Sequence, residues 1–594
     1  MTYDLATMKA PRAAGTLLRA LVAALENPVT GPMLADKLLA DVGVTRLRTL
    51  ETHEPMAMRQ PVFDEAQERA APGERIELAA LDAELAAQHA QGLAAEHARE
   101  LAADHAARHS TQLAADEAAP RRRFRPETAA DFTAAYRDGK LSPVDVAERA
   151  IAIVRESDAL RPKMRLLIAQ REGDVRAQAE ASQARYRRGA PLGPLDGVPV
   201  AVKDELDQAG YGTTVGTRFL GKSPAARDAE VVRRLRAHGA LLLGKANMHE
   251  IGLGVTGLNP HHGAARNPYA PGHATGGSSS GSAAAVGAGL CPIALGADGG
   301  GSIRIPAGLC GQVGLKPTLG RVSEHGAAEV CWSVAHIGPI AATVRDLALA
   351  YAAIAGPDEK DKTSLGQPRV RTDGITRADL RGVRLGVFPA WFDDADAEVV
   401  AACKVALAWL TDAGATVVEL EIPELEAMRI SHLVSIVTEM AASQLLHDRA
   451  HRADYGHDVR LNLALARRIT GYDYVQAQRL RVRVAQHFAR ALADVDALVT
   501  PTAGRTAPPL PEDALETGES NLEVVGQIIR FAAAANLTGL PALSVPCGYD
   551  AAGLPIGLQL MGRAWHEHEL MRLAAVVESR AERIAPRVHY RYLA

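Results

Sequence analysis

Apolar residues near the start of the chain recur at the spacing of one helix face. Leucines and valines fall three or four positions apart over residues 17–25, and the pattern stops at Pro28. A second helix is expected to open at Gly31, where a Gly-Pro pair precedes a new apolar stripe of Leu34, Leu38 and Val42. We therefore predict a helical arm over residues 1–75. Its apolar face needs a partner, which can be the body of the protein, a second subunit or a membrane surface, and packing on protein is favoured over a membrane.

A repeat of eight residues follows the arm over residues 84–107. Its three copies read ELAAQHAQ, GLAAEHAR and ELAADHAA, and their many alanines favour helix. A period of eight advances each copy by about 80° around a helix, so the repeated histidines do not form one stripe. They make a poor metal site for that reason. We predict a helical Ala/His-rich spacer over residues 76–122, with a His-rich metal-binding tract as the alternative.

From residue 123 onward, helical patterns alternate with short strand-like runs. The first helix is well marked, because Ser142 suits an N-cap and Pro143 suits the first turn. Strand-like runs occupy residues 198–202, 241–243, 383–388 and 415–422. This alternation predicts a layered α/β fold, and we assign residues 123–594 to one domain that carries the chemistry.

Charge and cysteine content narrow the functional classes. Across 594 residues, 66 Lys and Arg face 70 Asp and Glu, and the formal net charge of -4 argues against a nucleic-acid partner. Five widely spaced cysteines fit neither a disulfide framework nor a metal hook. The first apolar stretch is interrupted by Arg19, which argues against a secretory signal, and later apolar runs are too short to span a bilayer. We expect a cytoplasmic protein, with peripheral membrane contact through the arm as an alternative.

Three stretches of the domain carry candidate chemistry. They are GVPVAVKD at 197–204, GGSSSGSAAAVGAG at 276–289 and ADGGGSIRIPAG at 297–308. Lys203 ends an apolar run, where loss of hydration would favour a neutral amine that can act as a base, although a solvated surface lysine is the commoner situation. Taken together, a lysine, clustered hydroxyls and glycines suggest nucleophilic catalysis by a serine.

The serine-rich stretch has two rival interpretations. A phosphate loop would require a lysine followed by Ser or Thr after the glycines, whereas Gly281 is followed by Ser282 and an alanine-rich helix. A flexible linker fits poorly with the apolar helix that follows. The stretch is better interpreted as a turn that presents side-chain oxygens, because glycine reaches backbone conformations that larger residues avoid.

The third stretch places a run of glycines directly before Ser302. Successive N–H groups of such a run can converge on the charged oxygen of a tetrahedral intermediate, although a simple glycine turn has the same composition. The sequence around Ser302 reads G-G-S-I-R and does not match the G-x-S-x-G elbow of the α/β-hydrolases. A Ser-His-Asp arrangement is therefore not indicated, even though 20 histidines are available.

In this order, the three stretches resemble the amidase signature family. The resemblance extends from about residue 125 to the end and includes LLGKANMHE, ARNPYAP, GPIAATVRDLAL and GLPIGLQLMGR. It implies a central mixed β-sheet with helices on both faces. It also implies a serine amidase in which neutral Lys203 draws a proton through Ser278 from the nucleophile Ser302, which then forms an acyl-enzyme. It implies neither a metal nor an organic cofactor.

The resemblance also assigns roles to the neighbours of these three residues. The peptide bond before Ser278 is expected to be cis. Asp298 is expected to support the glycine loop, together with Ser279 and Arg304. The expected oxyanion donors are the backbone N–H groups of Gly299, Gly300, Gly301 and Ser302.

Within that family, the arm also resembles the opening of plant-type fatty acid amide hydrolases. The matching segments include ATMKAP, LENP and EPM in the arm, and VTPTAGRTAP and RFAAAANLTGLPALSVP in the domain. This implies a small-molecule substrate with a long acyl chain, such as an N-acylethanolamine, and a homodimer. The chain departs from these relatives in the octad repeat and in Ala297, where threonine is usual.

Three other functions stay open at this point. One is a glutaminase-like amidase subunit of a tRNA-dependent amidotransferase, which the arm disfavours. Another is an amidase of short or aryl amides. The third is an inactive scaffold on an amidase fold, against which the intact Lys203, Ser278 and Ser302 argue.

Overall fold

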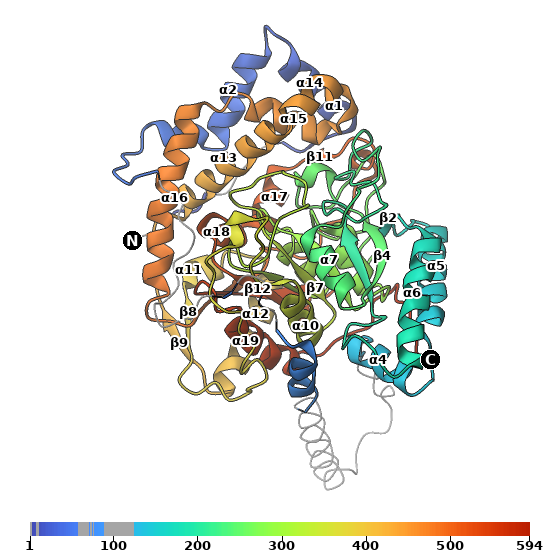
Figure 1. Cartoon of the computed structure of the whole chain (residues 1–594). Coiled ribbons are helices and arrows are strands. Elements are labelled where there is room, and N and C mark those ends of the chain that lie inside the picture. Colours follow the sequence, from blue (N-terminus) through green and yellow to red (C-terminus); the bar gives the residue numbers. More distant parts are fainter. Residues whose placement is uncertain are drawn as a thin grey trace, which may run out of the picture.

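An eleven-stranded mixed sheet forms the centre of the computed structural model, which describes residues 3–6, 11–56, 70–71, 74, 76–87 and 124–593 (Figure 1). Its strand order is β2-β4-β3-β5-β7-β6-β12-β13-β10-β8-β9. The strands are β2 (Leu167–Ala169), β3 (Pro199–Lys203), β4 (Leu241–Ala246), β5 (Ile293–Ala297), β6 (Val313–Lys316), β7 (Ile337–Ala341), β8 (Arg384–Val387), β9 (Thr416–Glu419), β10 (Ala497–Pro501), β12 (Ala542–Tyr549) and β13 (Pro555–Gly562). The predicted α/β class is confirmed, and so are the four strand-like runs, which correspond to β3, β4, β8 and β9.

The direction of two neighbouring strands positions the candidate chemistry. β3 and β5 run parallel, with Val202 opposite Leu295. The carboxyl ends of parallel neighbours meet at the same edge of a sheet. Lys203, the last residue of β3, therefore lies beside the end of β5, from which the chain enters the glycine run that leads to Ser302.

Helices pack on both faces of the sheet. Strand β12 shows this, because successive side chains of a strand point to opposite faces. Its Ser544 lies against Gly308 of α9 (Arg304–Leu309), whereas Cys547 contacts Cys403 of α12 (Ala397–Asp412). α8 (Ser280–Gly287) packs beside α9, and α10 (Val344–Ile354) and α19 (Glu567–Arg580) pack beside each other. The expected helical cover on both faces is confirmed.

The remaining helices surround this core. They are α4 (Ala129–Arg137), α5 (Pro143–Ala159), α6 (Glu172–Arg187), α7 (Glu230–Ala237), α11 (Pro389–Phe392), α13 (Leu425–Ser443), α14 (Leu445–His451), α15 (His457–Ala466), α16 (Gly471–Ala491), α17 (Leu522–Ile529) and α18 (Ala533–Thr538). α5 begins as predicted, because the Ser142 side chain accepts the Asp145 N–H at 3.2 Å in a capping box. The long helices α13 and α16 pack against each other, and in Figure 1 α13 lies toward the upper left while α16 runs down the left side.

Two helices form the N-terminal segment, and the body of the protein covers their apolar face. α1 (Gly15–Glu26) and α2 (Gly31–Asp41) begin close to the predicted positions. Leu18, Val22 and Leu25 of α1 are buried against Leu461 and Ala464 of α15. Strand β1 (Ala13–Ala14) also pairs with β11 (Glu519–Ser520), and Arg460 donates to Glu26.

The octad repeat falls mostly outside the described residues. Residues 78–87 are helical, and Leu78, Leu81 and Leu85 are buried in the main core. Residues 88–123, which include the repeated histidines, lie outside the description, so the spacer stays a prediction. Within the described ranges, no helix combines the length and apolar character needed to cross a bilayer.

Candidate active site

Lys203 and Ser278 are brought together at the carboxyl edge of β3 and β5. The Nζ atom of Lys203 donates to the Ser278 hydroxyl at 2.9 Å and to the carbonyl oxygen of Ala297 at 3.1 Å. Lys203 is 1% exposed and Ser278 2% exposed, so water does not compete for these bonds. Because Lys203 uses the backbone of Ala297, the departure from the usual threonine side chain leaves this contact in place.

The serine-rich loop lies directly against Ser302. The peptide bond between Gly277 and Ser278 is cis, as the family resemblance implies. Ser279 donates its backbone N–H to the Ser302 carbonyl oxygen at 3.3 Å, and its hydroxyl donates to Ala297 O at 3.2 Å. Ser302 itself is 7% exposed. Among the described residues, no direct hydrogen bond joins the Ser278 and Ser302 hydroxyls, so the two loops are linked here through the backbone.

The N–H groups of the glycine run before Ser302 differ in whether they already have a hydrogen-bond acceptor. Gly301 donates its N–H to Asp298 Oδ1 at 2.6 Å, so that group is already occupied. Among the described residues, no protein acceptor lies on the N–H groups of Gly299, Gly300 or Ser302. Three of the four expected oxyanion donors therefore have no acceptor among the described residues, and the fourth holds the loop in shape.

Asp298 is the anchor of this loop and is fully buried. Arg304 donates to both of its carboxylate oxygens, from Nε at 3.0 Å and from Nη2 at 3.1 Å. Burial alone would raise the pKa of Asp298, but the charges of Arg304 and Lys316 and a hydrogen bond from Asn536 outweigh it and hold that pKa well below its usual value. A carboxylate held in its ionised form by these partners thus fixes the Gly301 N–H and the start of α9.

Comparisons with known proteins assign the chain to a family. The family model described as Amidase matches residues 151–571. The chain belongs to the amidase signature family. It is 39% identical over 590 residues to a fatty acid amide hydrolase of Arabidopsis thaliana, a match that covers 98% of this chain and 94% of that one. This amidase thus shares almost its full length, arm included, with that relative.

Two further relatives match about three quarters of the chain. The amidase is 38% identical over 475 residues to a glutamyl-tRNA(Gln) amidotransferase subunit from Symbiobacterium thermophilum, a match that covers 75% of this chain and 95% of that one. The crystal structure of a peptide amidase from Stenotrophomonas maltophilia superposes with a TM-score of 0.67 at 31% identity, over 77% of this chain and 98% of that one. Both matches are nearly full-length for the relative and partial for this amidase.

The fold brings Glu205 to the amidase site, although sequence reasoning gave it no role. The side chain is largely buried, and its Oε2 atom lies 2.6 Å from the Nζ atom of Lys203. The position of Glu205, two residues after Lys203, is visible in the sequence. Solvated loops also carry acidic residues, so the sequence alone did not indicate a place in the site.

Asn536 and His432 also reach the glycine loop from distant parts of the amidase chain. Asn536 donates to the Asp298 carbonyl oxygen at 2.7 Å and accepts from Arg304 at 2.6 Å. His432, on α13, lies 2.8 Å from the Gly299 carbonyl oxygen. Sequence spacing gave no signal for either contact, because each depends on how helices pack more than 100 positions away.

Apolar side chains border the loop on the remaining sides. Ile436 lies next to Gly299, Ile529 next to Gly300, and Met440 next to Gly252 beside the Ser278 hydroxyl. Ile436 and Ile529 are only partly buried, and they come from α13 and α17. The amidase site therefore combines a polar reacting edge with an apolar wall.

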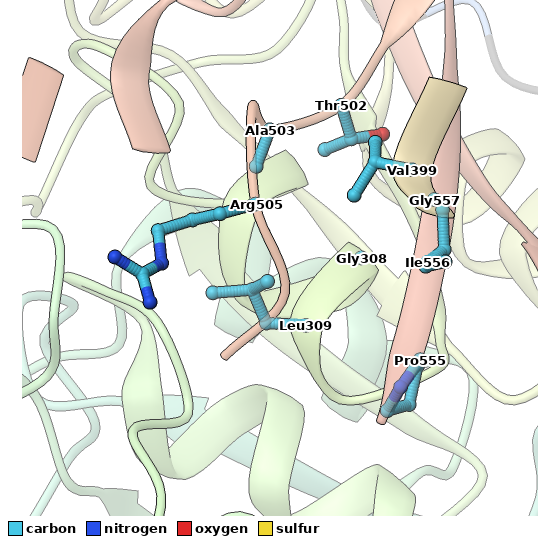
Figure 2. Close-up of a pocket in the computed structure, with 9 residues that line it drawn as sticks. All are labelled: Gly308, Leu309, Val399, Thr502, Ala503, Arg505, Pro555, Ile556 and Gly557. Carbon is cyan, nitrogen blue, oxygen red and sulfur yellow. The ribbon is translucent and has the colours of Figure 1, made fainter. Parts of the chain in front are cut away.

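The pocket drawn in Figure 2 is a different place. It lies at the C-terminal end of α9, where Gly308 and Leu309 face Thr502, Arg505 and Ile556. Ser302 precedes the opposite end of this helix, about 10 Å away at 1.5 Å per residue. Lys203, Ser278 and Ser302 are not among its lining residues. The predicted catalytic residues at the edge of β3 and β5 and this pocket are therefore separate places.

One group of potential metal ligands is assembled in the part of the amidase that the structure describes. It comprises His566, His568 and Glu569 at the start of α19. Arg563 lies 3.8 Å from Glu569, which opposes a cation there. The predicted serine mechanism gives this group no role.

Proposed function

We propose that this amidase hydrolyses fatty acid amides, such as N-acylethanolamines, with Ser302 as nucleophile, Ser278 as proton bridge and Lys203 as base. The observation that carries the proposal is the buried 2.9 Å contact between Lys203 Nζ and Ser278 Oγ, beside the loop that holds Ser302. A general base must lie within hydrogen-bond reach of the group it deprotonates, and Lys203 meets that condition for Ser278.

In the proposed reaction, Ser302 loses its proton to Ser278, and Ser278 passes its own proton to Lys203. The Ser302 oxygen then attacks the amide carbonyl, and the proton returns to the departing amine. The Ser278–Ser302 hydrogen bond forms in the substrate complex, because such bonds often tighten only there. Glu205 lies beside this relay, with its Oε2 atom 2.6 Å from the Nζ atom of Lys203. Water repeats the sequence and releases the acid.

The proposed oxyanion site uses the N–H groups of Gly299, Gly300 and Ser302. Each of these three N–H groups has no protein acceptor among the described residues. The Gly301 N–H contributes indirectly, because its bond to Asp298 sets the turn of the loop. Donors fixed before the reaction stabilise the developing charge without having to reorganise.

The choice of a long acyl chain rests on two observations. The partly buried Ile436 and Ile529, backed by the buried Met440, place apolar side chains next to the proposed reacting edge. The relative named fatty acid amide hydrolase also matches this chain through the arm, whereas the match to the tRNA amidotransferase subunit covers only 75% of it. A substrate tail that lies along this wall gains roughly 0.8 kcal/mol for each methylene it buries.

We also propose that the arm makes a homodimer contact. Val29, just before α2, and Met33, in its first turn, are 83% and 76% exposed, so the described residues leave an apolar end of the arm uncovered. Met33→Glu is expected to shift the protein from dimer to monomer by light scattering. A wild-type monomer would contradict the contact, and binding of the wild type to lipid vesicles would assign the surface to a membrane instead.

Hydrolysis assays test the proposed function. We expect the protein to cleave a long-chain N-acylethanolamine in preference to a short aryl amide or glutamine. Ser302→Ala and Lys203→Ala should each lower the rate by about 10⁴-fold or more. Lys404→Ala is the matched control, because this lysine is exposed and pairs with Asp393 at the surface.

Each outcome points to one function. Cleavage confined to short amides would keep the serine mechanism and remove the lipid substrate. Cleavage of glutamine that needs a second protein would favour an amidotransferase subunit. No activity, together with no labelling of Ser302 by a fluorophosphonate, would leave only the scaffold.

A further inference from the structure

His432 makes one well-defined contact, and it is with the glycine loop. Its Nε2 atom lies 2.8 Å from the carbonyl oxygen of Gly299. A carbonyl oxygen only accepts, so Nε2 carries the proton and donates it. The side chain is 2% exposed, which protects the bond from water. Burial, opposed by the hydrogen bond to Gly299 and aided by the charge of Arg481, lowers the pKa of His432 to about 4, so the ring is neutral near pH 7.

This hydrogen bond fixes the direction of the next N–H group. The peptide between Gly299 and Gly300 is trans, and in a trans peptide the carbonyl and the N–H point in opposite directions. When the Gly299 carbonyl is turned toward His432, the Gly300 N–H is turned away from it. That N–H has no acceptor among the described residues.

Packing reinforces the same arrangement. A side chain at Gly300 would meet the His432 ring, since an added Cβ would lie 2.8 Å from Cε1. Glycine therefore allows the ring to approach the backbone closely enough to hold it. No other side chain among the described residues donates to the Gly299 carbonyl.

We propose that His432 is a positioning residue that aims the Gly300 N–H at the oxygen of the tetrahedral intermediate. The inference rests on the proposed function of Ser302 and deepens it. His432 touches neither substrate nor Ser302. It acts through the backbone, so its loss weakens stabilisation of the transition state while substrate binding is kept.

The test compares three substitutions in the full-length protein. His432→Leu removes the donor, and His432→Gln keeps an N–H donor at a similar reach. Ser435→Ala is the matched control, because Ser435 lies one turn along α13 and bonds to the Ser431 carbonyl and to Gln478, away from the glycine loop. It removes a buried hydrogen bond of the same helix and leaves the loop untouched.

For hydrolysis of a long-chain N-acylethanolamine, we expect His432→Leu to lower kcat by about tenfold to a hundredfold at an unchanged KM. Its Ki for a long-chain trifluoromethyl ketone, whose adduct carries a charged oxygen, should rise by the same factor. His432→Gln should recover most of both losses, and Ser435→Ala should show neither. These readouts separate positioning from stability, since a merely less stable protein keeps the kcat of its folded fraction.

Two results would overturn the inference. One is an unchanged kcat and Ki in His432→Leu. The other is an equal loss in His432→Leu and Ser435→Ala. The proposed function fails separately, if Ser302→Ala keeps full activity. If Ser302→Ala is inactive and the His432 variants behave like wild type, only the role of His432 is lost.

Discussion

Arg304 holds Asp298 in a two-point ion pair with no exposed side-chain surface on either partner. The same carboxylate accepts the Gly301 N–H, so the pair lies directly behind the glycine run that precedes Ser302. The buried Asp298 carboxylate therefore neutralises Arg304, fixes the shape of the glycine loop and holds the start of α9.

Loss of Arg304 should damage both folding and activity. Arg304→Leu leaves the Asp298 carboxylate buried without its partner, and breaking a buried pair in this way costs about 3–5 kcal/mol. We expect a lower urea midpoint and loss of amide hydrolysis in the folded fraction. Arg381→Leu is the control, because its partner Asp379 lies at the surface and the midpoint should not move measurably. A normal midpoint in Arg304→Leu would contradict the anchoring role.

A methyl group at Gly301 should disturb the loop by collision. Gly301 has φ of +117°, and an added Cβ would lie 2.4 Å from Ile305 Cδ1 and 2.7 Å from Ala532 Cβ. We expect Gly301→Ala to reduce kcat/KM for amide hydrolysis by about a hundredfold, the scale of a lost oxyanion donor. Gly374→Ala shares a positive φ but has open space around it, so it separates backbone strain from collision. Equal activity in both variants would count against the prediction.

Asp346 should make stability depend on pH. Burial raises the pKa of this carboxyl to about 7, although hydrogen bonds from the Ala129 N–H and the Thr343 hydroxyl oppose the rise. A raised folded-state pKa means that the folded protein binds the proton more tightly than the unfolded chain. The resulting stability is fully present below the unfolded pKa, near 3.9, and is lost as the pH rises through about 7.

Asp346→Asn is expected to remove this dependence, because the amide resembles the protonated acid. Urea midpoints at pH 5 and pH 8 should differ less in the variant than in the wild type, and at pH 8 the variant should be the more stable. Asp36→Asn, with its side chain 64% exposed, should follow the wild-type curve. A variant that loses as much stability as the wild type between the two pH values would refute the assignment.

Two adjacent leucines of α1 should differ sharply. Leu18 is fully buried against α15, whereas Leu17 is 58% exposed. Leu18→Ala leaves a cavity and costs about 2–5 kcal/mol at the contact between arm and body, and Leu17→Ala should cost little. Limited proteolysis is the measurement, and the arm of Leu18→Ala should be cleaved first. Identical cleavage of the two variants would mean that α15 does not hold the arm.

The features that the sequence predicted correctly, such as helix starts and strands, depend on interactions between residues close together in the chain. Ser142 with Pro143, and Gly31 with the proline that follows it, set helix starts through contacts within a few residues, so their positions are visible in the sequence. The strand runs are visible for the same reason, because a short apolar segment between turns has few other stable states. The glycines and hydroxyls around Ser278 and Ser302 likewise stand in the sequence as local patterns.

The tertiary structure decided which residues lie next to these local sequence patterns. The parallel pairing of β3 with β5 places Lys203 beside Ala297, a residue 94 positions away. Glu205, Asn536 and His432 become neighbours of the site only because loops and helices pack around one sheet edge, and no spacing rule relates residues so far apart. The sequence by itself thus determined which groups the protein has for amide chemistry. Packing determined which of them meet, since buried hydrogen bonds and charges take their strength from the surroundings that the whole chain builds.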